Sequence, residues 1–249
     1  MRRLIDADLK RILIRPKFWI FNIIALIVGI LIMGKGIINT YDDDISYQLL
    51  LQIKQAYRIA TILQSFVIFS SVYSDEFRSM AFITVVGRGI SRRKLVFAKL
   101  LDSIILTLLI SAITGGIMLA FGGIMSRVAT DPEEIGMIAF LFLNDFVYEI
   151  IAITIPAVFI YITEKIPVSV FVLIVLHITS VLLGAYTFDW VKELAIQFYF
   201  TEVLSNAWTH FVLGNYPMAF FDCLGCLLCY IGGCIGIIRL TFEKKELSF

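Results

Sequence analysis

Long apolar stretches, six in number, dominate this sequence and set the class of fold open to it. They cover residues 18–38, 59–74, 103–126, 135–163, 166–188 and 218–238. An α-helix of about 20 apolar residues spans the roughly 30 Å hydrocarbon core of a bilayer. The chain is 59% hydrophobic and 16% charged, whereas soluble domains are about 45–50% apolar and about 25% charged. These stretches predict an all-α polytopic membrane protein with one transmembrane domain over residues 1–249.

The six stretches differ in polarity. Residues 103–126 and 166–188 carry no charge, while 59–74 is short and rich in Ser, Thr and Gln. A polar span of this kind is expected to be shielded by neighbouring helices. Asp145 and Glu149 interrupt the fourth stretch, and Asp222 lies in the last. Asp102 and Asp222 lie near predicted helix starts, where a carboxylate complements the helix dipole.

Residues 1–17 precede the first stretch and are basic. The apolar residues Ile5, Leu9, Ile12 and Leu13 recur at helical spacing among these charges. This pattern predicts an amphipathic helix on the membrane surface that ends near Pro16.

The basic residues predict the orientation, because Lys and Arg resist translocation. Six lie in the N-terminal segment, six in the loop 75–102, one at Lys165 and three in the C-terminal tail. The other side receives five basic residues and two short acidic runs. The net charge of +1 therefore conceals two faces of different charge. We expect a multi-pass membrane protein with both termini in the cytosol.

The segment 187–217 is predicted to be extracellular but is too apolar for an ordinary loop. It mixes eight aromatic residues with scattered charges, a composition that favours the headgroup zone. We expect short helices that dip into the outer leaflet before the last span. The alternative, a seventh span, would place the two basic ends on opposite sides.

Sequence patterns for catalysis are weak. Residues 29–36 read GILIMGKG, but this lookalike of a phosphate-binding loop lies inside an apolar span without a preceding strand. Ser91 follows Gly89 in a G-x-S triplet, and its base would have to be His177 or His210. His177 is interpreted as a helix-packing residue. We therefore expect no catalytic residues and no cofactor in this chain.

Four cysteines share the run CLGCLLCYIGGC, at positions 223, 226, 229 and 234. The spacing is similar to iron–sulfur motifs, but one rigid apolar helix cannot wrap a cluster. Together with Gly232 and Gly236, these residues are typical of close helix packing. No metal site is predicted.

Asp145 and Glu149 are four residues apart and share one helix face. A charge at the centre of a span costs about 2.5–3.5 kcal/mol on insertion scales. Either the pair lines a polar path for substrate, or it projects above the outer leaflet into water. Both readings stay open at this point.

The segment between the second and third stretches, from Tyr73 on, reads YSDEFRSMAFITVVGRGISRRKLVFAKLL. Ser91 is expected to cap a short basic helix that leads into the third span. The loop resembles that of ABC-2 type transporter permeases, roughly E-x-E-R-G, then T-P-x-S-R and a Lys at the next span. Glu76, Arg78, Ser91, Arg92 and Lys99 match this pattern, whereas Ser79 and Gly89 replace its Gly and Pro.

This resemblance implies the transmembrane subunit of a bacterial ABC exporter, similar to permeases of peptide export and lantibiotic immunity. It implies a dimer with a second permease copy or paralogue, two copies of a separate ABC ATPase that binds ATP and Mg²⁺, and amphipathic peptides or hydrophobic compounds as cargo. Membrane lipids are further partners, and nucleic acid is not expected. The resemblance assigns ATPase coupling to the loop residues Glu76, Arg78, Arg88, Ser91, Arg92, Arg93 and Lys94.

Two other function classes compete with the exporter. One is a secondary transporter or channel-like protein that uses Asp145 and Glu149 as ion or proton sites, although no internal repeat supports it. The other is an intramembrane enzyme, which lacks a convincing nucleophile and base.

Overall fold

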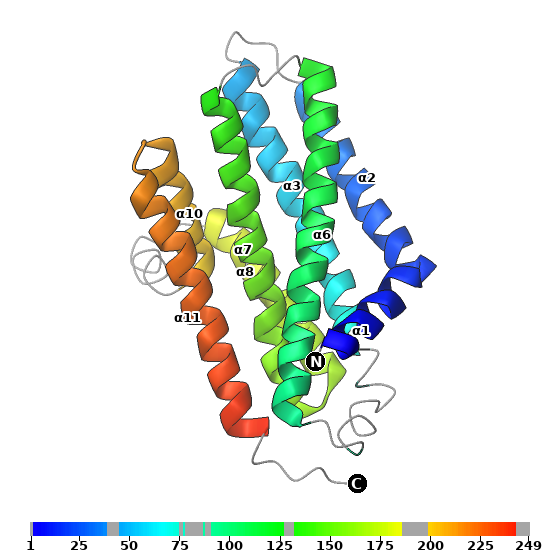
Figure 1. Cartoon of the computed structure of the whole chain (residues 1–249). Helices are drawn as coiled ribbons and strands as arrows, with labels where there is room; N and C mark the ends of the chain where they lie inside the picture. Colours follow the sequence, from blue (N-terminus) through cyan, green and yellow to red (C-terminus); the bar gives the residue numbers. More distant parts are fainter. Residues whose placement is uncertain are drawn as a thin grey trace.

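The structure is a computed structural model of the whole chain, and it describes residues 2–38, 45–74, 77, 87, 91–126, 132–185 and 199–242. Within these ranges the regular structure is helical, which confirms the all-α prediction there. The elements are α1 (Arg2–Ile14), α2 (Pro16–Ile38), α3 (Ile45–Phe69), the π-helical turn η1 (Ser70–Ser74), α6 (Arg92–Ser126), α7 (Pro132–Thr163), α8 (Ile166–Ala185), α10 (Phe200–Val212) and α11 (Tyr216–Phe242). The long helices run side by side, and the first and last helices end at the same lower end (Figure 1).

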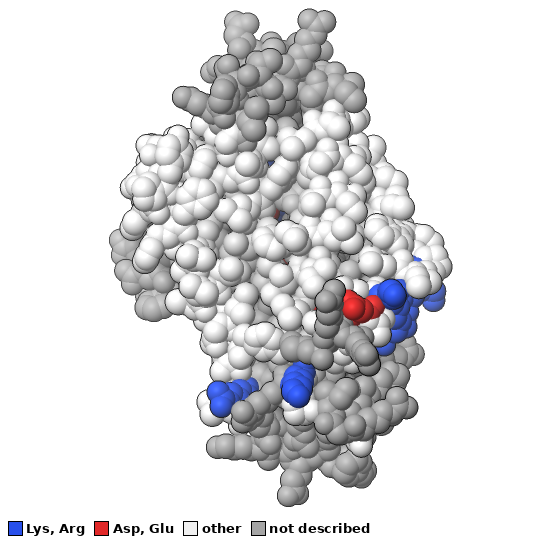
Figure 2. Space-filling view, viewed as in Figure 1, with Lys and Arg blue, Asp and Glu red and all other residues white. Residues whose placement is uncertain are grey.

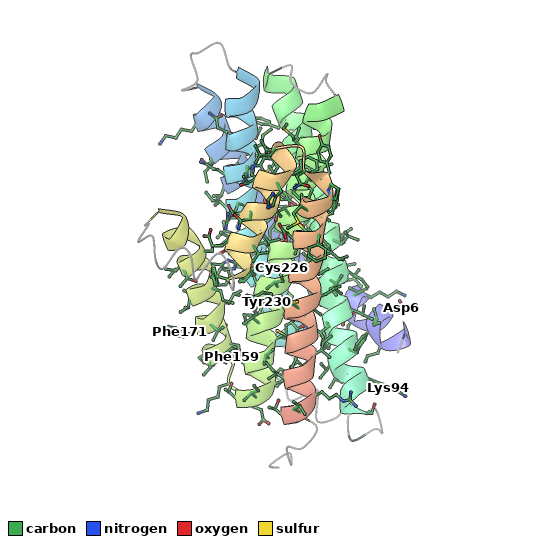
Figure 3. All side chains as sticks on the ribbon, turned by 90° about the vertical axis from the view of Figure 1, so that its left-hand side faces the viewer. Asp6, Lys94, Phe159, Phe171, Cys226 and Tyr230 are labelled. Carbon is green, nitrogen blue, oxygen red and sulfur yellow. The ribbon has the colours of Figure 1, made fainter. Side chains whose placement is uncertain are left out.

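Four helices are long and apolar enough to cross a bilayer, within α2, α6, α7 and α11. The candidate spans are Pro16–Lys35, Lys94–Phe121, Gly136–Thr163 and Tyr216–Thr241. Their exposed side chains are largely apolar, and the charged side chains visible on one face gather in its lower part (Figure 2). Phe159 of α7 and Phe171 of α8 are both exposed and project outward (Figure 3). The chain is thus a helical membrane protein with several candidate spans.

The other two predicted spans are also helical but are less clear by these criteria. The stretch 59–74 forms the second half of α3 together with η1. The stretch 166–188 begins α8, whose apolar part over Ile166–Ser180 is shorter than the four candidate spans.

A sharp elbow joins the N-terminal helix to the first span. α1 ends at Ile14 and α2 begins at Pro16, where proline is favoured because the first helical N–H needs no partner. The indole Nε1 of Trp19 donates a hydrogen bond to the carbonyl oxygen of Leu13 at 2.7 Å across the elbow. Ile12 and Phe18, on either side of the bend, are fully or almost fully buried. The predicted break at Pro16 is confirmed, and the two helices are fixed to one another.

α7 is the most enclosed of the four candidate spans. In its most apolar window 72% of the residues are buried, against 22% in α11. One hydrophobic cluster at its C-terminal half contains Phe69, Tyr73 and Tyr161, and a second at its N-terminal half contains Phe140 and Trp208. α7 therefore carries its side chains, including the two acidic ones, into the interior of the bundle.

The helix α6 differs from the prediction for the basic loop. A short helix followed by a span from residue 103 was expected, but Arg92–Ser126 forms one continuous helix. Leu95 and Val96 are already buried in its first turns. Because burial of these residues stabilises helical structure from the start, the basic residues 92–94 form the first turn of one long helix.

The segment before the last span contains a helix that packs on the bundle. α10 turns into α11 through Gly214, whose φ of 78° is a left-handed conformation that glycine adopts without strain. Phe211 of α10 stacks on Phe140 of α7 with ring centroids 4.2 Å apart. The Asn144 amide of α7 donates to the carbonyl oxygen of Leu204 at 2.8 Å. Residues 186–198 of this segment lie outside the described residues.

Candidate functional site

Four ionisable side chains from two helices form a polar centre inside the upper half of the bundle. Asp145 and Glu149 lie on α7, 7% and 0% exposed respectively. Lys54 and Arg58, also four residues apart, lie on α3, which packs against α7. Both cations interact electrostatically with Asp145. We call Lys54, Arg58, Asp145 and Glu149 the charged centre.

Only some of the carboxylate oxygens of Asp145 and Glu149 accept hydrogen bonds. The Ser111 hydroxyl of α6 donates to Glu149 Oε2 at 2.9 Å, and the Tyr57 hydroxyl donates to the Ser111 carbonyl oxygen at 3.3 Å. Asp145 Oδ2 and Glu149 Oε1 are buried and have no hydrogen-bond partner among the described residues. A buried acceptor without a hydrogen-bond partner costs free energy. Each of these two atoms can therefore bind a proton or accept a hydrogen bond from a bound molecule.

The two cations lie against aromatic rings. Lys54 Nζ is 4.5 Å from the ring centroid of Trp208, and Arg58 Cζ is 5.2 Å from that of Tyr148. The negative face of an aromatic ring attracts a cation, most strongly where water is excluded. The formal charges of the charged centre cancel, which lowers the cost of holding four ionisable groups inside a membrane protein.

A chain of hydrogen bonds passes through His177 of α8, and its member Tyr148 also carries the ring that Arg58 contacts. The ring atom His177 Nε2 is 2.8 Å from Ser65 Oγ of α3, and Nδ1 is 2.7 Å from the Tyr148 hydroxyl of α7. Tyr148 also lies 3.2 Å from Ser180 Oγ. Because a neutral imidazole has one donor and one acceptor nitrogen, one tautomer can satisfy both neighbours. His177 is a packing residue that links three helices, as the sequence suggested.

The two sequence alternatives for the acidic pair can now be compared. Projection into water does not fit two carboxylates that are enclosed by α3 and α6. Their shared face is confirmed, and it points inward. The sequence did not reveal that Lys54 and Arg58 lie near Asp145. Four-residue spacing on α3 was the signal that could have found them, because it matches the spacing of the acids on α7.

A second polar cluster ties the N-terminal helix to α6 at the lower end of the molecule. Lys99 Nζ lies 2.6 Å from Asp8 Oδ2 of α1, and the two side chains are 2% and 12% exposed. Asp102 Oδ2 is 3.7 Å from the same ammonium and is fully buried. Asp8 also pairs with Arg11 at 3.6 Å. We call Asp8, Lys99 and Asp102 the α1–α6 clamp.

This cluster corrects the interpretation of Asp102. The residue lies well inside α6, which begins at Arg92, so it is too far from the helix start to act on the dipole. It lies beside Lys99 instead. Asp222 is likewise beyond the first turn of α11 and is 3.8 Å from His210 Nε2 of α10, so both dipole interpretations are wrong.

The predicted coupling residues are described in part. Ser91 precedes α6, Arg92 and Arg93 begin it, and Lys94 is exposed. Lys94 and Asp6 of α1 lie near the same lower end (Figure 3). Glu76, Arg78 and Arg88 lie outside the described residues. In the part of the chain that the structure describes, the basic start of α6 and the helix α1 therefore lie toward the same end of the molecule.

The lookalike motifs do not assemble into sites within the described residues. Ser91 opens α6, whereas His177 is bonded to Ser65 inside the bundle, so no serine–histidine pair forms at Ser91. No group of three or more His, Cys, Asp and Glu that could hold a metal occurs in the described ranges. All four cysteines are free thiols. Three are buried, as packing predicts, but a Cβ at Gly232 or Gly236 would meet no described atom within 4 Å.

Comparison with protein-family models, curated proteins and solved structures found no match for this chain.

Proposed function

We propose that this chain is the transmembrane permease subunit of an ATP-driven ABC exporter in the bacterial plasma membrane. A separate pair of ATPase subunits would bind ATP and Mg²⁺, and a second permease would complete the dimer. The chain itself would be non-catalytic. Amphipathic peptides or similar hydrophobic compounds are the proposed cargo.

The observation that carries this proposal is the α1–α6 clamp. Arg92, which matches the ABC-2 loop pattern, begins α6, and Lys99 on the same helix is buried against Asp8 of α1. A force applied by a partner to the start of α6 would therefore act on α1 as well. A partner shifts a conformational equilibrium only through contacts that differ between the two states. The clamp supports coupling because it joins α1 to α6, so that a partner bound at either helix would move both.

The proposed topology has six spans. α8 has 20 residues, enough to cross about 30 Å at 1.5 Å per residue, and α3 has 25. We assign both as spans that are shielded by their neighbours. The amphipathic α1 would then lie on the cytosolic surface with both termini in the cytosol, and α10 would lie in the outer leaflet.

The test is complex formation with an ABC ATPase encoded by a neighbouring gene. The presence of such a gene is itself the cheapest check of the proposal. Arg92→Glu with Arg93→Glu should weaken binding of that ATPase about 100-fold, since like charges across an interface cost several kcal/mol. Lys165→Glu, exposed at the α7–α8 turn, is the control and should bind normally. If the double variant couples ATP hydrolysis as the parent does, the assignment of the coupling residues is wrong.

A second candidate function, a secondary transporter or channel, is favoured by one observation. Asp145 Oδ2 and Glu149 Oε1 are buried acceptors without a partner among the described residues, as ion or proton sites in membranes are. Liposomes containing this chain alone separate the two functions. Proton or cation flux without ATPase, lost in Asp145→Asn with Glu149→Gln and retained in Asp222→Asn, would favour the transporter. Absence of flux together with ATP-dependent export would favour the permease.

A further inference from the structure

A pocket lies at the lower end of the first candidate span, between the α1–α2 elbow and the end of α3. It is a partly open depression with a volume of about 340 Å³, which lies within the usual range for small-ligand sites. Arg15 and Lys17 contribute positive charge, Ser70 and Ser71 contribute hydroxyl groups, and Phe21 and Phe66 form an apolar wall. None of the described residues that line the pocket is acidic.

From this combination we infer that the pocket binds the phosphate headgroup of an anionic phospholipid. Arg and Lys side chains form charge-assisted hydrogen bonds with phosphate oxygens, and serine hydroxyls can add further donors. The two serines belong to η1, and π-helical turns frequently occur at functional sites. This inference is independent of the proposed export function.

The position of the pocket relative to the bilayer supports a lipid as its occupant. The candidate span begins at Pro16, between the two basic residues, so their charges lie where headgroups border the hydrocarbon. Basic residues at this depth attract anionic lipids. A soluble anion would reach the charges but would leave the aromatic wall unused.

The surface above the pocket fits acyl chains better than a protein partner. Phe21 is 56% exposed and Ile24 49%, and both point outward from α2. Leu63 and Ile59, on the neighbouring α3, are each 38% exposed. This apolar surface continues upward from the pocket along two packed helices. A phospholipid has the matching order of groups, with a charged head below and hydrocarbon above.

The elbow holds the two basic residues in place. The Phe18 N–H donates to the Arg15 carbonyl oxygen at 3.2 Å, and the Arg15 N–H donates to that of Ile12 at 3.1 Å. Together with the Trp19 to Leu13 bond at 2.7 Å, these contacts fix the backbone around the site. A preorganised site loses less entropy on binding, so the lipid should be retained on purification.

The experiment is native mass spectrometry of the purified chain in neutral detergent, titrated with phosphatidylglycerol or with phosphatidylcholine of identical acyl chains. Neutral micelles remove the surface potential of a bilayer, so contacts within the pocket decide affinity. Arg15→Gln with Lys17→Gln should weaken phosphatidylglycerol binding about 30-fold. Lys10→Gln with Lys165→Gln removes the same charge from exposed positions and should change it less than about threefold. Equal losses in the two double variants would overturn the inference.

A second variant tests the pocket without changing charge. Ser71→Phe should fill it and reduce phosphatidylglycerol binding, while Ser205→Phe on exposed α10 should not. Full binding by Ser71→Phe would show that the basic residues act without the pocket and would refute the site. Glycerol phosphate, added as a competitor, distinguishes a site for free phosphate from a site for lipid. If it displaced phosphatidylglycerol at concentrations as low as those at which phosphatidylglycerol binds, the inference of a lipid site would also be refuted. Intrinsic tryptophan fluorescence confirms that each variant is folded.

Discussion

Loss of the Lys99 ammonium should be among the most damaging single changes in this protein. Lys99 Nζ lies 2.6 Å from Asp8 Oδ2 and 3.7 Å from Asp102 Oδ2, and all three side chains are largely or fully buried. Lys99→Met keeps the chain length but leaves two buried carboxylates without their shared cation. Removing one partner from a buried ion pair costs about 3–5 kcal/mol. We therefore expect a loss of this size in the free energy of unfolding.

The assay is thermal denaturation of the purified chain in detergent, followed by tryptophan fluorescence. For a chain of this size about 1 kcal/mol corresponds to about 2–4 °C, so the melting temperature should fall by roughly 10 °C. Lys94→Met, one turn earlier and exposed, is the matched control and should stay within about 0.5 kcal/mol.

A double-mutant cycle separates the ion pair from general packing. In the presence of Lys99→Met, the change Asp8→Asn should cost less than it does in the parent chain, because the closest ion pair of the Asp8 carboxylate is then already lost. A coupling of about 0.5–3 kcal/mol is expected for residues in direct contact. If Lys99→Met melts like Lys94→Met, or if the two changes are additive, the α1–α6 clamp does not hold α1 on the bundle.

Three further predictions concern packing inside the bundle. A side chain at Gly29 would meet Met118 Cε and, at 3.1 Å, the Ala60 Cβ, so Gly29→Val should cost about 1–3 kcal/mol by overpacking; Gly34→Val, with open space around it, should not, and equal melting would contradict the packing. His177→Leu should cost about 1–3 kcal/mol because it removes the hydrogen bonds between the ring and the buried hydroxyl groups of Ser65 and Tyr148, a loss that chemical denaturation measures and that His177→Gln should partly restore. Cys229 is the exposed cysteine, so a lipophilic maleimide should label it before the three buried ones; mass spectrometry of the peptides would refute this if another thiol reacted first.

Hydropathy predicted the helices well because each span is a local property of the chain. Residues 18–38, 135–163 and 218–238 are helical over their lengths in the structure, and the break at Pro16 is where proline chemistry places it. The basic helix expected after Ser91 and the span expected from residue 103 are one continuous helix in the structure. Burial of Leu95 and Val96 against the rest of the bundle extends the helix back to Arg92.

For each polar site the sequence predicted only one partner of the contact. Spacing along α7 placed Asp145 and Glu149 on a common face, but Lys54 and Arg58 were counted among the charges of the outer side of the membrane. Their partners come from α7 and α10, far away in sequence. Lys99 was recognised as part of a loop motif, whereas its contact with Asp8 joins segments separated by two spans.

The sequence by itself determined that this chain forms apolar helices for a bilayer, and it predicted that most basic residues lie on one side. Both follow from composition and local order, since the bilayer acts on each segment separately. The tertiary structure decided which charges meet inside: Asp145 lies near the cations of α3, and Lys99 pairs with Asp8. Pairing depends on which helices are neighbours, and that depends on shape complementarity between side chains that are distant along the chain. The cost of burying a charge makes these contacts necessary, but only the packed bundle specifies the partners.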